Sequence, residues 1–134
     1  MNHILIAENE EFLVQVLKDN LASEGNTVSL AKDGEAVFEE IQKKKPSLII
    51  LDLLLPKKSG FDVLRELKTN PEWQLIPVIA LSGLGEDTEI KHALDLGASD
   101  YFVKSQHPIQ EVIGKVKEYL QNKGIATDTP IPTI

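Results

Sequence analysis

Polar residues that follow apolar segments could together bind a metal ion and a phosphoryl group. Asp52 interrupts an otherwise apolar run, and burial of an unpaired ionised carboxylate costs several kcal/mol. We therefore expect Asp52 at the end of a strand, facing solvent, a metal or a cation. The simpler alternative is an aspartate that only turns the chain. Glu8 and Asn9 follow the first apolar run, and Ser82 and Lys104 follow two later ones.

The residue types in this set favour phosphoryl transfer. Oxygen atoms of Glu8, Asn9 and Asp52 are hard ligands that suit Mg²⁺. Lys104 adds a compact positive charge and Ser82 a hydroxyl donor, so the set could hold a phosphoryl group while Asp52 acts as nucleophile. Taken singly, a serine in a loop is usually a turn residue and a lysine is usually solvated. The prediction therefore requires these side chains to meet.

Alternating apolar patterns predict the elements that would position these residues. Short apolar runs indicate strands, and apolar residues at helical spacing after each run indicate helices. This alternation is typical of an α/β fold with a parallel sheet covered on both faces. The expected strands cover residues 4–7, 27–31, 48–52, 76–81 and 101–103, and the helical stripes cover residues 12–21, 36–41, 61–67, 86–96 and 109–120.

Such a sheet places ligand sites beyond the carboxyl ends of its strands, at the point where strand order reverses. The polar residues would gather at that edge. In chain order they are Glu8, Asn9 and Glu10 after the first strand, Asp52 at the end of the third, Ser82 at the end of the fourth, and Lys104 at the end of the fifth.

Size and composition limit the class of protein. The 134 residues fit one domain, and the absence of cysteine excludes disulfides and thiolate metal sites. The formal net charge of -7 argues against a nucleic-acid or membrane surface as partner. The sequence shows neither a signal-peptide pattern nor an apolar stretch near the ~20 residues of a membrane span. We expect a domain over residues 1–122, a flexible tail over residues 123–134, and a cytoplasmic location.

Four segments resemble the receiver domain of two-component response regulators, with an architecture similar to the single-domain chemotaxis type. They are the acidic loop after the first strand, residues 51–56 with Gly60, residues 80–83, and residues 97–104. The resemblance covers residues 2 to about 122. It implies a flavodoxin-like (βα)5 three-layer sandwich whose five parallel strands have the order 2-1-3-4-5.

The resemblance also implies roles around a phosphoryl group. Asp52 would be the phosphoacceptor, Ser82 the switch hydroxyl beside Gly83, and Lys104 the counter-ion of the phosphate. Tyr101 would be the aromatic side chain that rotates inward on activation. An ordinary half-buried strand aromatic is the alternative for Tyr101, because strands favour aromatic residues.

For the metal, the resemblance implies Mg²⁺ held by Glu8, Asn9, Asp52 and the backbone carbonyl of Leu54. The family usually has two acids after the first strand, whereas Asn9 is neutral. An amide oxygen still coordinates Mg²⁺ but removes one negative charge, so we expect weaker binding than in a receiver with two acids.

Three further positions affect the expected chemistry. Ser105 stands where the family commonly has proline, and a cis bond there without proline would cost ~3 kcal/mol. We therefore expect a trans bond or a shifted Lys104. Leu54 and Leu84 occupy positions that govern access of water to the acyl phosphate in the family. They should slow its hydrolysis, unless they only pack against the loops.

The resemblance implies a stand-alone receiver that accepts a phosphoryl group from a histidine kinase or phosphotransfer protein. It would assist its own phosphorylation without being a dedicated enzyme. The fourth helix, fifth strand and fifth helix, roughly from Ile90 to Leu120, would contact a downstream protein. Direct DNA binding is not expected, since neither a helix-turn-helix pattern nor a basic stripe is present. The three histidines lack metal-ligand spacing and are expected at the surface.

Other functions remain as alternatives. A pseudo-receiver would keep the fold as an interaction module without phosphorylation, and Asn9 and Ser105 motivate this hypothesis. A phosphohydrolase of the haloacid dehalogenase type is disfavoured, because it needs a second aspartate where this chain has Leu54. Flavin binding is also disfavoured, because the acidic first loop would repel a phosphate group.

Overall fold

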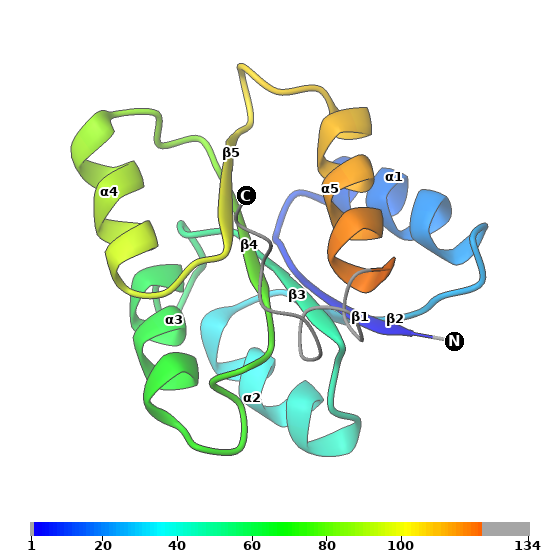
Figure 1. Ribbon diagram of the computed structural model, residues 1–134, viewed down its shortest axis with the longest axis horizontal. Helices are drawn as coiled ribbons and strands as arrows, with labels where there is room; N and C mark the ends of the chain where they lie inside the picture. The colour runs from blue at the N-terminus through cyan, green and yellow to red at the C-terminus, as the bar shows by residue number, and fades with distance from the viewer. Residues whose placement is uncertain (1, 122–134) are drawn as a thin grey trace, which may run out of the picture.

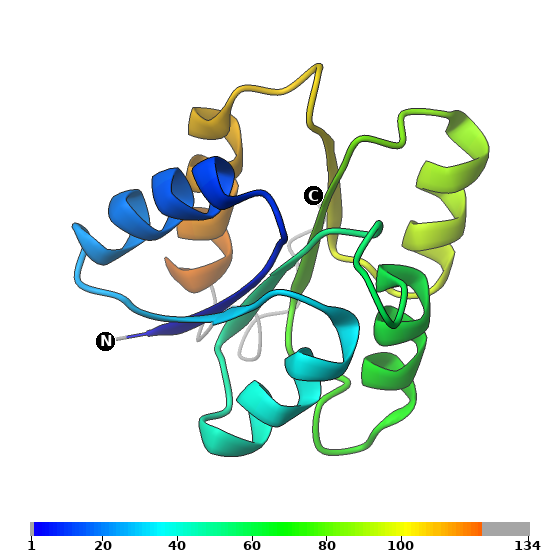
Figure 2. The same cartoon turned by 180° about the vertical axis from the view of Figure 1, so that it is seen from behind.

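The computed structural model describes residues 2–121, which form a three-layer α/β sandwich (Figures 1 and 2). The tail expected over residues 123–134 lies outside the described residues. The strands are β1 (His3–Ala7), β2 (Thr27–Ala31), β3 (Leu48–Leu51), β4 (Val78–Ser82) and β5 (Asp100–Val103). The helices are α1 (Glu11–Ala22), α2 (Gly34–Lys43), α3 (Gly60–Thr69), α4 (Asp87–Asp95) and α5 (Ile109–Gln121).

The sheet confirms the predicted topology. Its five strands are parallel and run in the order β2-β1-β3-β4-β5. Ala7 pairs with Leu51, Leu51 pairs with Ala80, and Ser82 pairs with Val103. The carboxyl ends of β1, β3, β4 and β5 therefore lie side by side, and strand order reverses between β1 and β3.

The sheet has an apolar cluster on each face, which explains why the sequences of the central strands are continuously apolar. Ile49 and Leu51 belong to the cluster beneath α2, α3 and α4, whereas Leu48 and Ile50 belong to the cluster beneath α1 and α5. Strands covered on both faces need apolar side chains at every position. Each such side chain contributes about 1.5–3 kcal/mol when fully buried, so the sheet is a rigid base for its carboxyl edge.

Helix starts at that edge differ in how they are capped. The Asp33 side chain accepts a hydrogen bond from the backbone N–H of Ala36 at the start of α2, and Ser59 does the same for Asp62 in α3. Glu10 occupies the same position before α1 but makes no capping bond with its side chain. A cap residue normally satisfies an orphan N–H group in this way. The Glu10 carboxylate is therefore directed elsewhere.

The helical stripe expected from residue 12 begins later than its spacing indicates. Phe12 is 82% exposed, although Leu17 and Leu21 are fully buried. Phe12 lies in the first turn of α1 and lines a groove of about 430 Å³ together with Leu13, Lys104 and Ile109. Helical spacing does not reveal which turn of a helix first reaches the sheet.

The helices described within residues 2–121 include none with the length and apolar character of a membrane span.

His3 corrects the expectation of three surface histidines. Its side chain is 8% exposed and joins β1 to β2, with ring nitrogens 2.7 Å from the Thr27 hydroxyl and 2.9 Å from the Ser29 hydroxyl. Burial lowers the pKa of His3, the charge of Lys44 lowers it further, and Glu40 opposes this shift. The neutral ring is consequently the form that the fold favours.

Gly60 seats α3 directly on the chain segment that follows β3. Its N–H donates to the Leu53 carbonyl at 3.0 Å. A β-carbon on Gly60 would collide with the Asp52 carbonyl oxygen and the Leu53 α-carbon. The close approach explains why glycine stands here, because only a residue without a β-carbon allows this contact.

Gly60→Ala should lower the free energy of unfolding by about 1–3 kcal/mol, the usual cost of overpacking. Gly114→Ala is the matched control, since Gly114 lies in α5 and a β-carbon there would meet nothing within 4 Å. This control should be stabilising by up to about 1 kcal/mol, because alanine is the better helix former. Urea unfolding of both variants measures the difference, and equal effects would contradict the proposed collision.

His3 should make stability depend on pH in mild acid. Because the pKa of folded His3 is below that of the unfolded chain, its stabilisation is complete above pH ~6.5 and is lost as pH falls through the folded value. Between pH ~7.5 and pH ~5, the wild-type protein should lose more unfolding free energy than His3→Gln. Equal losses in urea titrations would show that His3 is not the titrating group.

Candidate functional site

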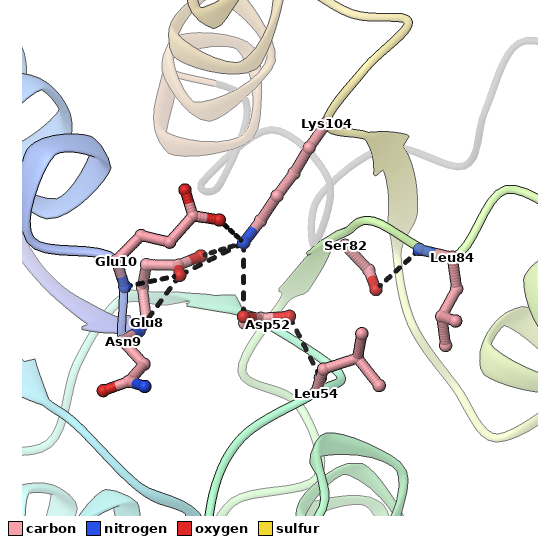
Figure 3. A network of polar contacts seen from close by, with 8 residues as sticks. All are labelled: Glu8, Asn9, Glu10, Asp52, Leu54, Ser82, Leu84 and Lys104. Carbon is pink, nitrogen blue, oxygen red and sulfur yellow. Dashed lines mark hydrogen bonds and ion pairs between the residues drawn. The ribbon is translucent and has the colours of Figure 1, made fainter.

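Three of the polar residues predicted at the carboxyl edge, Glu8, Glu10 and Asp52, meet around the ammonium group of Lys104 (Figure 3). Its Nζ atom lies 3.3 Å from Oδ2 of Asp52, 3.1 Å from the Glu8 carboxylate and 2.8 Å from Oε1 of Glu10. Glu8 is 2% exposed and Asp52 is 5% exposed. The site is therefore a cluster of two buried carboxylates, one exposed carboxylate and one ammonium group.

Asp52 lies immediately after β3, as its place in the apolar run predicted. Its backbone N–H donates to the Ala7 carbonyl at 2.9 Å, which ties the end of β3 to the end of β1. Oδ1 accepts a hydrogen bond from the N–H of Leu54 at 3.0 Å, while Oδ2 faces Lys104. The buried carboxylate thus has the cationic partner that its burial requires.

Glu8 follows β1 and folds its carboxylate back over its own loop. Oε2 accepts hydrogen bonds from the N–H groups of Asn9 and Glu10, each at 3.0 Å. Oε1 is buried and lies 3.1 Å from Lys104 Nζ, but no donor is oriented to form a hydrogen bond with it. Burial raises the pKa of Glu8, and the nearby charge of Asp52 adds to the rise.

Lys104 follows β5, and its N–H donates to the Ser82 carbonyl at 2.8 Å. Burial alone would lower the pKa of Lys104, but hydrogen bonds to Glu10 and Glu8 and the charge of Asp52 raise it overall. The side chain is consequently a firmly charged ammonium group. Its positive charge offsets only part of the negative charge of the three carboxylates.

The loop after Lys104 has the trans geometry expected without proline. No peptide bond among residues 2–121 is cis, and Lys104 still reaches Asp52. The His107 ring closes the loop, because its Nδ1 accepts a hydrogen bond from the N–H of Val103 at 2.9 Å. Ser105 therefore does not displace the lysine.

Ser82 is the last residue of β4 and is fully buried. Figure 3 shows it on the side of Asp52 opposite to Glu8. Its Oγ accepts a hydrogen bond from the N–H of Leu84 at 3.2 Å. Gly83 is exposed, and a β-carbon there would meet nothing within 4 Å. Leu84 is partly exposed, and its backbone connects Ser82 to Tyr101, whose hydroxyl bonds to the Leu84 carbonyl.

Tyr101 in β5 is turned inward and is 8% exposed. Its hydroxyl donates to the Leu84 carbonyl at 2.6 Å. Burial raises the pKa of Tyr101. The ring is therefore more deeply buried than an ordinary half-buried strand aromatic, and its hydroxyl is bonded to the loop that follows Ser82.

The predicted metal ligands are only partly assembled. Glu8 and Asp52 face each other across the Lys104 ammonium, but the Asn9 side chain is exposed and points away from it in Figure 3. The described part of the chain contains no group of three or more His, Cys, Asp or Glu side chains arranged to hold a metal. Leu54 is 58% exposed.

The donor chemistry nevertheless fits a hard divalent cation. Two carboxylates, an amide and a backbone carbonyl are oxygen ligands of the kind that Mg²⁺ accepts. The buried Oε1 atom of Glu8 accepts no hydrogen bond and is paired only with the charge of Lys104, 3.1 Å away. Glu10 is the residue near the site to which sequence reasoning gave no role, although its place in the acidic loop indicated its position.

Comparison with known proteins identifies the family. The model of the response regulator receiver domain matches residues 4–117. Response regulator RR06 of Streptococcus pneumoniae is 41% identical over 102 residues, which cover 76% of this chain and 46% of that protein. The chain spans about half the length of the curated relatives it matches, several of which are named transcriptional regulators.

Two solved structures have the same fold over nearly their full length. The phosphorylated cyanobacterial phytochrome response regulator RcpA has a TM-score of 0.78 at 28% identity, with 96% of each chain covered. The Mn²⁺-bound form of response regulator Rcp1 has a TM-score of 0.77 at 25% identity, with 99% of this chain and 100% of that chain covered. The family model and the likeness to solved response regulators agree, and the chain belongs to the response regulator receiver domain family.

Proposed function

We propose that this receiver accepts a phosphoryl group on Asp52 from a histidine kinase or a phosphotransfer protein. The observation that carries the proposal is the buried Asp52 carboxylate, with the Lys104 ammonium 3.3 Å from Oδ2. Oδ1 is held by the Leu54 N–H, which fixes the orientation of the carboxylate. The phosphorylated state of RcpA is consistent with this role, since that protein shares the fold.

The proposed step is a simple displacement at phosphorus. An oxygen of Asp52 forms a bond to phosphorus while the bond from phosphorus to the donor atom breaks, and the donor keeps that electron pair. Negative charge on the phosphoryl oxygens must be balanced throughout. Lys104 supplies one positive charge at the correct edge of the sheet, and Ser82 supplies a hydroxyl that can donate to a phosphoryl oxygen.

The proposal includes Mg²⁺, held by Glu8, Asn9, Asp52 and the Leu54 carbonyl. When bound, the cation would neutralise charge on the phosphoryl group that Lys104 leaves unbalanced. The buried Oε1 atom of Glu8, which accepts no hydrogen bond, supports this assignment. The neutral Asn9 leaves the site with one negative charge fewer than a second acid would, so we expect modest affinity.

For output, we propose a cytoplasmic, stand-alone regulator that is not a dedicated enzyme and that signals through α4, β5 and α5. RcpA and Rcp1 are solved response regulators whose chains the receiver fold covers almost entirely. The longer relatives named as transcriptional regulators support the alternative, in which an attached output domain binds DNA.

A second candidate function is the phosphorylation-independent pseudo-receiver. It is favoured by one observation: Lys104 already occupies the space between Glu8 and Asp52. In that case the contacts of Lys104 with the acidic residues would be structural ion pairs, and the surface of the fold would only bind partner proteins.

Incubation with acetyl phosphate and Mg²⁺ should add one phosphoryl group to the wild-type protein and none to Asp52→Asn. Intact mass measurement detects the adduct, and chelation of Mg²⁺ should prevent it. Circular dichroism should first confirm that both proteins are folded. If the folded wild-type protein gains no mass with this donor or with a histidine kinase, the pseudo-receiver is the better assignment.

Asn9→Asp should bind Mg²⁺ about tenfold more tightly than the wild-type protein, because it adds a negative charge to the metal site. Isothermal titration gives the affinity directly. Asn70→Asp is the matched control, since it makes the same charge change in the segment after α3. Equal affinities for Asn9→Asp and the wild type would remove Asn9 from the ligand set.

A further inference from the structure

Glu10 commits its carboxylate to Lys104 and to no other described side chain. Its Oε1 atom lies 2.8 Å from Lys104 Nζ, the shortest contact of that ammonium. Glu10 stands at the cap position of α1 but makes no capping bond, unlike Asp33 before α2 and Ser59 before α3. The contact with Lys104 is therefore not a by-product of helix capping.

The three carboxylates that contact the ammonium differ in how deeply they are buried. Glu8 and Asp52 are buried at the ends of β1 and β3, whereas the Glu10 side chain is 62% exposed at the rim of the site. An ammonium group has three N–H donors, and here each has a carboxylate acceptor. A long lysine side chain would otherwise sample many rotamers. Contacts with the buried Glu8 and Asp52 and with the exposed Glu10 therefore restrict where Nζ can lie.

The proposed chemistry engages two of these three acceptors. Asp52 would carry the phosphoryl group, and Glu8 belongs to the proposed metal ligands. Glu10 has neither task, so its contact with Lys104 can persist through metal binding and phosphoryl transfer. Once Asp52 is phosphorylated, the N–H group of Lys104 that faced it must turn to a phosphoryl oxygen. Another N–H group of Lys104 can remain bonded to Glu10.

We propose that Glu10 is a positioning residue that holds the Lys104 ammonium over Asp52 during phosphoryl transfer. The inference rests on the proposed function, because it assigns Lys104 to the phosphoryl group. Glu10 does not touch that group and acts only through Lys104. Its effect must consequently vanish when Lys104 is removed.

A double-mutant cycle tests this dependence. Phosphorylation by acetyl phosphate should be about two- to fivefold slower in Glu10→Gln than in the wild type, the range expected for a partly exposed ion pair. In a Lys104→Met background, Glu10→Gln should change nothing further. The control Glu11→Gln makes the same charge change one residue along, in the first turn of α1, and should leave the rate unchanged. A slowing that persists in the Lys104→Met background, or an equal slowing in Glu11→Gln, would overturn the proposal.

A spectroscopic measurement tests the same inference without phosphorylation. In a ¹H–¹⁵N correlation spectrum of lysine ammonium groups, Lys104 should give a signal protected from hydrogen exchange, identified by its loss in Lys104→Met. Glu10→Gln should accelerate that exchange, and Glu11→Gln should not. Unchanged protection in Glu10→Gln would refute the positioning role. A wild-type protein that shows this pattern but accepts no phosphoryl group would refute the proposed function alone.

Discussion

The carboxyl edge of the sheet depends on the charge balance between buried carboxylates and one ammonium group. Glu8 and Asp52 are brought together by neighbouring strands, and two like charges in a poorly solvated place repel each other. Lys104 lies between them and makes their burial tolerable. The remaining negative charge still favours a cation. A cluster of carboxylates that is neutralised only in part attracts further positive charge.

The sheet provides the geometry for this balance. Because the strands are parallel, β1, β3, β4 and β5 deliver polar residues to the same edge, and the reversal of strand order leaves space between the loops that follow β1 and β3. Backbone bonds hold those ends together: Asp52 donates to Ala7, and Lys104 donates to Ser82. The side chains of the site are thus fixed by main-chain contacts, and their chemistry depends on the rigid apolar sheet beneath them.

The sequence was sufficient to predict the fold and most residues of the acidic cluster. Alternating apolar runs and helical stripes indicate the strands and helices, and a carboxylate inside an apolar run is unusual. Sequence reasoning failed where side-chain direction decides the outcome. Phe12 fits a helical stripe but lies beyond the sheet, and His3 is buried because neighbouring hydroxyls happen to match its ring nitrogens. The contact of Glu10 with Lys104 joins residues 94 positions apart. No local pattern encodes such a contact.

That long separation in sequence has a consequence for biosynthesis. Lys104 and Glu8 are 96 positions apart, and Lys104 and Asp52 are 52 positions apart. Contacts between distant segments form only after most of the chain has been ordered. A nascent or partly folded chain therefore carries the Asp52 carboxylate without its cationic partner. Because Lys104 follows β5, Glu8 and Asp52 are buried together with their counter-ion only once β5 has joined the sheet.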